Sequence, residues 1–242
     1  MNHSLRALAL LLPLCGLGLP AGAADFSITP VRIFMEPRDR AVAITVTNDG
    51  EQEIVMQADL FVWKQKPDGE FDLVPTEDLI LSPPILKLAP KSRQVVRLAR
   101  LGPPPAGSQL TYRMIVREIP EARPASTDNT LQIALAFSLP IFITPPTAKR
   151  DLSCSATRAS ANAVMATCKN SGTAFAQVRE FVLLASNGER IATRDTGGYI
   201  LPEITRSFEI KREGAAIPSG AMKLQVALDD GTMQAVDLAL TD

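Results

Sequence analysis

The stretch LQIALAFSLPIFI, from Leu131 to Ile143, decides the fold class of this chain. It places apolar residues at every second position, which is the period of a β-strand: Leu131, Ile133, Leu135, Phe137, Leu139, Ile141 and Ile143. At about 3.3 Å per residue such a strand extends for roughly 40 Å, about twice an ordinary strand. Either the whole row is a long core strand, or part of its apolar face is kept for another chain.

The residues before this stretch contain further short apolar runs. Strands are predicted at 26–35, 41–48, 54–64, 79–81, 94–101 and 109–118. Turn signals lie between them, such as Asn48-Asp49-Gly50 and Ser82-Pro83-Pro84. About seven short strands of this kind are typical of an immunoglobulin-like sandwich.

The residues after this stretch repeat the same style. Pro145-Pro146 end the long strand, because proline cannot donate to a strand ladder. Shorter strands are predicted at 152–157, 163–170, 178–185, 204–210, 222–227 and 234–240, and a loop or strand switch at 197–202. The predicted fold is all-β, with two immunoglobulin-like β-sandwich domains at 24–145 and 146–242 and a cleft between them.

The chain begins with a pattern typical of a secretory signal peptide. Arg6 precedes an apolar run at 7–19, and the small residues Ala21-Gly22-Ala23 follow it. Residues 1–23 are therefore expected to be removed on export. Cys15 follows Leu14 rather than a small residue, which argues against a lipoprotein. No later run reaches the roughly 20 apolar residues of a membrane span.

The composition limits the chemistry that the mature chain can perform. The one histidine of the sequence, His3, lies in the signal segment, so no imidazole remains for acid-base work or metal binding. Serines such as Ser82, Ser92 and Ser138 then have no histidine to activate them. The formal net charge of −1 gives no reason to bind nucleic acid. Neither an enzyme, a metal site nor a cofactor is predicted.

The two cysteines of the mature chain, Cys154 and Cys168, flank two short predicted strands. They are placed to face each other across a hairpin, and a disulfide is the default in an exported chain. Such a crosslink contributes on the order of 3 kcal/mol in the chain-entropy model. A metal site would need further cysteine or histidine ligands.

Several motifs, taken in order, resemble the periplasmic chaperones of chaperone-usher pilus assembly. They are Val31-Arg32-Ile33-Phe34, Thr47-Asn48, Ser82-Pro83-Pro84, Leu88, Pro90, Gln94, Val96, Arg97, Tyr112-Arg113, Arg117-Glu118-Ile119-Pro120 and Leu131-Gln132-Ile133-Ala134-Leu135. The resemblance implies a protein of the periplasm that binds pilus (fimbrial) subunits. It would complete their fold with a donated strand and deliver them to an outer-membrane usher.

The resemblance also implies which residues form the donor strand. Leu131, Ile133 and Leu135 match the donor positions, where alternating side chains fill the open groove of a subunit. Phe137 either continues this row or belongs to the protein's own core. Burial of each donor residue contributes about 1.5–3 kcal/mol before entropy costs.

A second implied element is a basic pair that anchors the C-terminal carboxylate of the subunit. Arg32 matches its first member, and a guanidinium can hold a carboxylate through two hydrogen bonds. The second member is usually a lysine, but Pro140 occupies that position. Arg97 is the expected replacement and Arg117 the next candidate, unless the subunit is anchored differently. Thr144 likewise replaces an arginine that commonly forms an interdomain salt bridge.

These departures point to a divergent, archaic-type branch, and two other classes stay open. A structural pilus subunit is also exported and immunoglobulin-like, but it usually has one domain. An adhesive or scaffolding protein with two such domains would bind finished surfaces rather than nascent subunits. An exposed apolar row favours aggregation, so a self-capping homo-oligomer is a further expectation.

Overall fold

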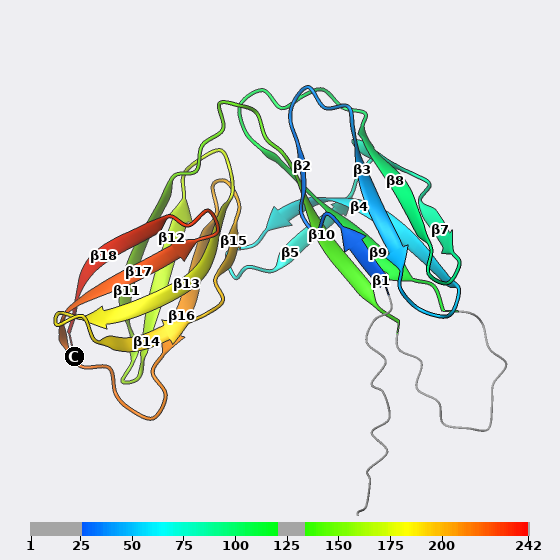
Figure 1. Cartoon of the computed structure of the whole chain (residues 1–242). Helices are drawn as coiled ribbons and strands as arrows, with labels where there is room; N and C mark the ends of the chain where they lie inside the picture. Colours follow the sequence, from blue (N-terminus) through cyan, green and yellow to red (C-terminus); the bar gives the residue numbers. More distant parts are fainter. Residues whose placement is uncertain (1–25, 121–133, 242) are drawn as a thin grey trace, which may run out of the picture.

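The computed structural model describes residues 26–120 and 134–241 of the 242-residue chain. Within these ranges the chain is all-β, as expected, and no helix is long and apolar enough to cross a membrane. Figure 1 shows two lobes that diverge from a common junction. The connection between them spans residues 144–151, and the expected boundary after residue 145 falls inside it. The predicted signal peptide, 1–23, lies outside the described residues.

The first lobe is a sandwich of two sheets. One sheet has the order β1-β3-β8-β6 and the other the order β2-β10-β9-β4-β5, with β7 also paired to β4. The strands of the first sheet are β1 (Phe26–Thr29), β3 (Ala41–Asn48), β6 (Leu79–Ser82) and β8 (Arg93–Arg100). Those of the second are β2 (Ile33–Met35), β4 (Ile54–Gln65), β5 (Phe71–Pro75), β7 (Ile85–Leu88), β9 (Leu110–Glu118) and β10 (Ala136–Ile143).

The second lobe is a smaller sandwich built in the same way. One sheet has the order β11-β12-β16 and the other the order β14-β13-β17-β18, with β15 also paired to β13. The strands of the first sheet are β11 (Leu152–Ser160), β12 (Ala163–Asn170) and β16 (Thr205–Lys211). Those of the second are β13 (Ala176–Ala185), β14 (Arg190–Arg194), β15 (Gly198–Ile200), β17 (Gly220–Leu228) and β18 (Met233–Leu240).

The structure divides the expected strand at 26–35 between the two sheets of the first lobe, so the expectation of one continuous strand is wrong. β1 pairs antiparallel with β3, whereas β2 pairs parallel with β10. Pro30 lies between β1 and β2 and has no N–H to continue a ladder. The chain changes sheets there, and Arg32 sits at the crossing.

The short strands β5, β7 and β14 were not expected from the sequence, whereas β15 lies within the loop or strand switch expected at 197–202. In β5 only Leu73 is partly buried, so its hydrophobic pattern is weak. β7 and β15 are each held as an additional partner of a longer strand, β4 and β13 respectively. Such strands form because a neighbour supplies backbone partners, which local patterning does not reveal.

Alternation along the strands decides which side chains fill the cores. In β10, Leu139, Ile141 and Ile143 are all buried in the core of the first sandwich. This half of the alternating row is therefore a core strand. The second core is centred on Phe181 and Phe208, whose ring centroids are 4.9 Å apart. Each lobe thus has a hydrophobic core of its own.

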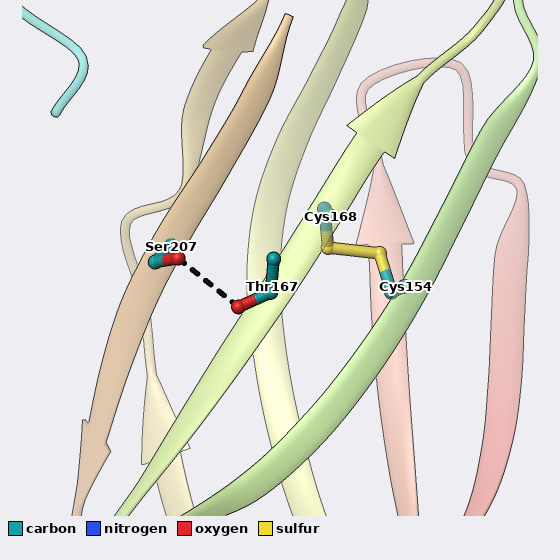
Figure 2. Close-up of a disulfide and its surroundings, with 4 residues drawn as sticks. All are labelled: Cys154, Thr167, Cys168 and Ser207. Carbon is teal, nitrogen blue, oxygen red and sulfur yellow. Dashed lines mark hydrogen bonds between the residues drawn. A yellow bond between two sulfur atoms is a disulfide. The ribbon is translucent and has the colours of Figure 1, made fainter. Parts of the chain in front are cut away.

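The expected disulfide joins Cys154 on β11 to Cys168 on β12, which lie directly opposite each other in register (Figure 2). Cys168 is fully buried in the second core. On the other side of β12, the hydroxyls of Thr167 and Ser207 lie 3.0 Å apart and link β12 to β16 (Figure 2). The three-stranded sheet therefore has a side-chain link between β11 and β12 and another between β12 and β16.

Candidate functional site

One edge of β10 is paired along its whole length and the other only at its end. On the first edge, the register with β9 runs from Ala136 opposite Arg117 to Ile143 opposite Leu110. On the second edge, β2 pairs with residues 141–143 only. No other described strand pairs with the 136–140 portion of that edge. Unpaired backbone donors and acceptors beside a fixed strand can accept an extended segment of another chain.

The expected donor residues lie at the start of β10 and ahead of it. Leu131 and Ile133 fall outside the described residues. Leu135 is half-buried and packs against the first core. Phe137 is 36% exposed, and its ring packs edge-on against Phe26 at a centroid distance of 4.8 Å. Phe137 is therefore shared between the protein's own packing and the surface.

Arg32 faces the second lobe from the crossing between β1 and β2. Its Nη1 donates to Oδ2 of Asp229 at 2.8 Å and to Oε1 of Gln177 at 2.9 Å. The hydrogen bond with Asp229 is the main reason that the pKa of Arg32 lies above its usual value, and the Tyr199 phenol adds to this effect. Its side chain is still 36% exposed, so the residue is only partly covered by the second lobe.

Arg113 lies directly opposite Pro140 in the register of β9 and β10. Its guanidinium carbon is 3.9 Å from the ring centroid of Trp63 and 4.3 Å from that of Phe71. Nη1 donates to the carbonyl oxygen of Ser138 at 3.1 Å, whereas the buried Nε has no partner among the described residues. Burial lowers the pKa of Arg113 to about 10, so it stays charged at neutral pH.

Tyr199, in β15 of the second lobe, lies close to both Arg32 and Arg113. Its ring centroid is 5.8 Å from the guanidinium carbon of Arg113, and its phenol interacts with Arg32. Burial raises the pKa of Tyr199, so its hydroxyl keeps its proton. Two guanidinium groups therefore lie around one neutral phenol, and guanidinium N–H groups are donors that bind carboxylates well.

The other two expected anchor candidates lie elsewhere in the first lobe. Arg97 is exposed on β8, between the buried Val96 and Leu98, and so points away from the core of the sandwich. No described contact joins Arg97 to Arg32. Arg117 lies on β9 and pairs with Asp59 of β4 at 2.8 Å. The structure therefore brings Arg113, rather than Arg97, to the same interdomain surface as Arg32.

An aromatic cluster holds the two lobes together behind these arginines. Trp63 and Phe142 of the first lobe and Leu201 of the second are fully or almost fully buried in it. The Phe142 ring is stacked on Phe175 at 4.1 Å, and Tyr199 packs edge-on against Trp63 at 5.3 Å. A buried apolar interface of this kind restricts the relative motion of two domains.

Two glutamines add hydrogen bonds across the same junction. The Gln65 side chain donates to the carbonyl oxygen of Tyr199 at 2.9 Å and accepts from the Leu201 amide at 3.1 Å. The Gln109 amide donates to the Thr173 carbonyl oxygen at 2.8 Å, and its side chain accepts from the Phe175 amide at 3.0 Å. These bonds satisfy backbone groups that the interface buries.

The Gln109 side chain also donates to the hydroxyl of Thr144 at 2.6 Å. Thr144 thus contributes to the junction through a neutral hydrogen bond. The ion pair across the junction comes instead from Arg32 and Asp229. The interdomain ion pair of this protein therefore does not involve residue 144.

The sequence alone indicated no functional role for Arg113, Tyr199 or Asp229. Alternation along β9 places Arg113 on the face opposite Tyr112 and Met114, which are core residues, so its outward direction could have been read from the sequence. The partners of Arg32 and Arg113 on the second lobe could not have been read from the sequence, because they depend on how the two lobes meet. Across the described ranges, no three His, Cys, Asp or Glu residues gather as a metal site.

A family model described as the pili and flagellar-assembly chaperone, PapD N-terminal domain, matches residues 25–149. This span contains the first lobe and Arg32, Arg113 and β10. The search of curated proteins finds no match.

Many solved structures share the fold of both lobes. A chain of the CsuC–CsuE chaperone and tip adhesion subunit complex, from archaic Csu pili of Acinetobacter baumannii, is 22% identical. The match covers 90% of this chain and 100% of that one, with a TM-score of 0.63. The CupB2 chaperone of Pseudomonas aeruginosa is 17% identical over 89% of this chain and 100% of that one, with a TM-score of 0.57.

A third match is a chain of the Salmonella enterica SafA pilin in complex with the SafB chaperone, at 13% identity and a TM-score of 0.59. It covers 90% of this chain and 98% of that one. The expected pair of immunoglobulin-like sandwiches is thereby confirmed. Because the family model covers more than half of the chain and includes the strand with the open edge, this protein belongs to the family of pilus-assembly chaperones of the chaperone-usher pathway.

Proposed function

We propose that this chaperone acts in the periplasm, captures pilus or fimbrial subunits by donor-strand complementation, and delivers them to an outer-membrane usher. The donor segment comprises the alternating residues Leu131, Ile133, Leu135 and Phe137. Their side chains fill the open groove of an incomplete immunoglobulin fold while the backbone pairs with its edges. The chaperone needs neither a catalytic group nor a cofactor, because binding and folding energy drive the process.

The observation that carries this proposal is the half-open edge of β10. Residues 141–143 are fixed between β9 and β2, and the part of the edge ahead of them has no described partner. A strand that is fixed at one end and open at the other can pair with a subunit while the chaperone itself stays folded. A strand buried on both edges along its full length could not serve in this way.

We assign the anchor for the carboxylate of the subunit to Arg32 and Arg113. Arg113 stands beside Pro140, so it supplies a cation next to the position where the family usually has a lysine. Both arginines lie around Tyr199, and burial of Arg113 reduces screening by water. The absence of the lysine also supports an archaic-type branch of the family.

The test is co-expression in a periplasm with each immunoglobulin-like subunit encoded nearby, followed by recovery of soluble one-to-one complex. We expect wild type, Arg97→Ala and Arg117→Ala to yield complex. Arg32→Ala, Arg113→Ala and Ile133→Asp are expected to lose it. Melting temperatures of the free variants report whether each still folds, because Arg113 is buried.

A loss of complex with Arg97→Ala but not with Arg113→Ala would move the second anchor to β8. If no subunit is captured by the wild type, the chain is better explained as an adhesive or scaffolding protein. Binding of the purified chaperone to the purified usher, with and without subunit, tests delivery separately.

A further inference from the structure

The guanidinium of Arg32 is already paired with a carboxylate that belongs to this chain. Nη1 donates to Asp229 and to Gln177, and both acceptors come from the second lobe. A guanidinium that binds a carboxylate side-on uses two N–H donors. A carboxylate from a ligand must therefore either displace Asp229 or bind beside it.

Asp229 is held in this position by its own backbone. Its amide donates to the carbonyl oxygen of Gln177 at 3.1 Å, so the two acceptors on Arg32 are fixed next to each other. The Asp229 side chain is only 14% exposed. Little water is thus available to screen its charge from a second carboxylate.

The junction between the lobes has other bonds besides this ion pair. Gln65 and Gln109 make hydrogen bonds across it, and Phe142 is fully buried against Phe175. The contact between Arg32 and Asp229 can therefore open without separating the lobes. This independence distinguishes it from a contact whose main effect is to hold the two domains together.

We propose that Asp229 is an internal competitor for the carboxylate anchor. It occupies Arg32 in the unloaded chaperone and lowers the affinity of the anchor for carboxylates in general. The inference rests on the proposed function, in which Arg32 binds the C-terminal carboxylate of a subunit. A subunit that also takes the donor strand overcomes the competition, whereas a lone carboxylate does not.

The experiment measures binding of N-acetyl-L-leucine to the mature chain by NMR of the arginine Nε–H signals. N-acetyl-L-leucinamide, which lacks only the negative charge, is the matched probe. We expect Asp229→Asn to lower the Kd of the acid about fivefold, because a like charge beside the anchor is removed while an acceptor for Arg32 remains. Binding of the amide is expected to stay unchanged.

Asp230→Asn is the matched control variant. It removes the same charge one residue away, but Asp230 pairs with Arg150 at 2.7 Å rather than with Arg32. It should leave the Kd of the acid within twofold of wild type. Gln177→Glu adds a second carboxylate beside Arg32 and is expected to weaken binding of the acid.

Equal effects of Asp229→Asn on the acid and the amide, or weaker binding of the acid, would overturn the proposal. So would an equal gain with Asp230→Asn, since this would indicate net charge alone. The result is separable from subunit capture, because no subunit enters this measurement. If the chaperone captures subunits but Asp229→Asn does not change the Kd of the acid, the proposed function stands and the role of Asp229 as a competitor is wrong.

Discussion

Arg113 combines a buried charge with two aromatic faces, and this explains why arginine rather than lysine occupies the position. The planar guanidinium lies against Trp63 and Phe71 and still donates to Ser138. An ammonium is compact and more strongly hydrated, so it neither stacks in this way nor tolerates the burial as well.

We therefore expect Arg113→Lys to lower the free energy of unfolding by about 1–3 kcal/mol and to weaken subunit capture. Chemical denaturation and recovery of complex measure the two effects. Arg117→Lys is the control, because Arg117 is about half exposed and its pair with Asp59 contributes at most about 1 kcal/mol. If stability and capture are unchanged in Arg113→Lys, the contact of the guanidinium with Trp63 and Phe71 contributes to neither.

The pKa of Arg113 gives a prediction about pH. Burial lowers it to about 10, so the folded protein disfavours the charged form relative to the unfolded chain. The stability penalty of that charge is present at all pH values below about 10, and it diminishes only as the pH rises above this value. Capture should accordingly be level between about pH 6 and 9 and fall above about pH 10, as measured by complex formation at fixed ionic strength. A decline centred near neutral pH would contradict this role.

At the level of elements, β10 shows what could be predicted from its sequence. The alternation of apolar residues correctly indicated a strand at 136–143, although the expected start was too early, because Ala134 and Leu135 lie ahead of β10. Leu139, Ile141 and Ile143 form its core portion. The sequence did not reveal where the row leaves the core, because this depends on where β2 begins to pair with it. The division of the first expected strand at Pro30 was missed for a related reason, since a change of sheet depends on both sheets.

Two substitutions along this row separate the core from the donor segment. Leu139→Asp buries a charge in the first core, where the side chain is 3% exposed, and is expected to unfold the lobe. Ile133→Asp is expected to leave the melting temperature of the free protein nearly unchanged and to abolish capture. Thermal denaturation and co-expression distinguish the two. Unfolding by Ile133→Asp would make residue 133 part of the core and remove it from the donor strand.

The disulfide between β11 and β12 lies in the second lobe, away from β10 and Arg113. Replacing Cys154 and Cys168 together with serine is expected to lower the stability of that lobe by about 3 kcal/mol. Subunit capture at low temperature should persist, because the donor strand and the proposed anchor arginines belong to the first lobe. Loss of capture from a variant that remains folded would show that the second lobe contributes more than the geometry of the junction.

At the level of the whole molecule, the junction depends on residues that no local pattern identifies. Gln65 lies at the end of β4. Its side chain donates to the carbonyl oxygen of Tyr199 and accepts from the amide of Leu201, both in the other lobe. Gln65→Leu leaves the Leu201 amide without its side-chain partner, at a cost of about 1–3 kcal/mol, whereas the Tyr199 carbonyl oxygen still accepts from Nη1 of Arg206 at 2.9 Å. We expect a broader distribution of interdomain angles by small-angle X-ray scattering and weaker capture. Gln234→Leu on the edge strand β18 is the matched control, and an equal effect there would contradict the assignment.

Because one edge of β10 is half open, amide hydrogen exchange in this strand can show whether a subunit is bound. In an antiparallel ladder, alternate amides face opposite edges, so part of Ala136–Leu139 faces the open side. Those amides should exchange quickly in the free chaperone, whereas the amides of residues 141–143 lie in a doubly paired segment and exchange slowly. Pro140 has no amide and separates the two groups. Loading with a subunit would slow only the first group, so one strand carries both the signal and its internal reference.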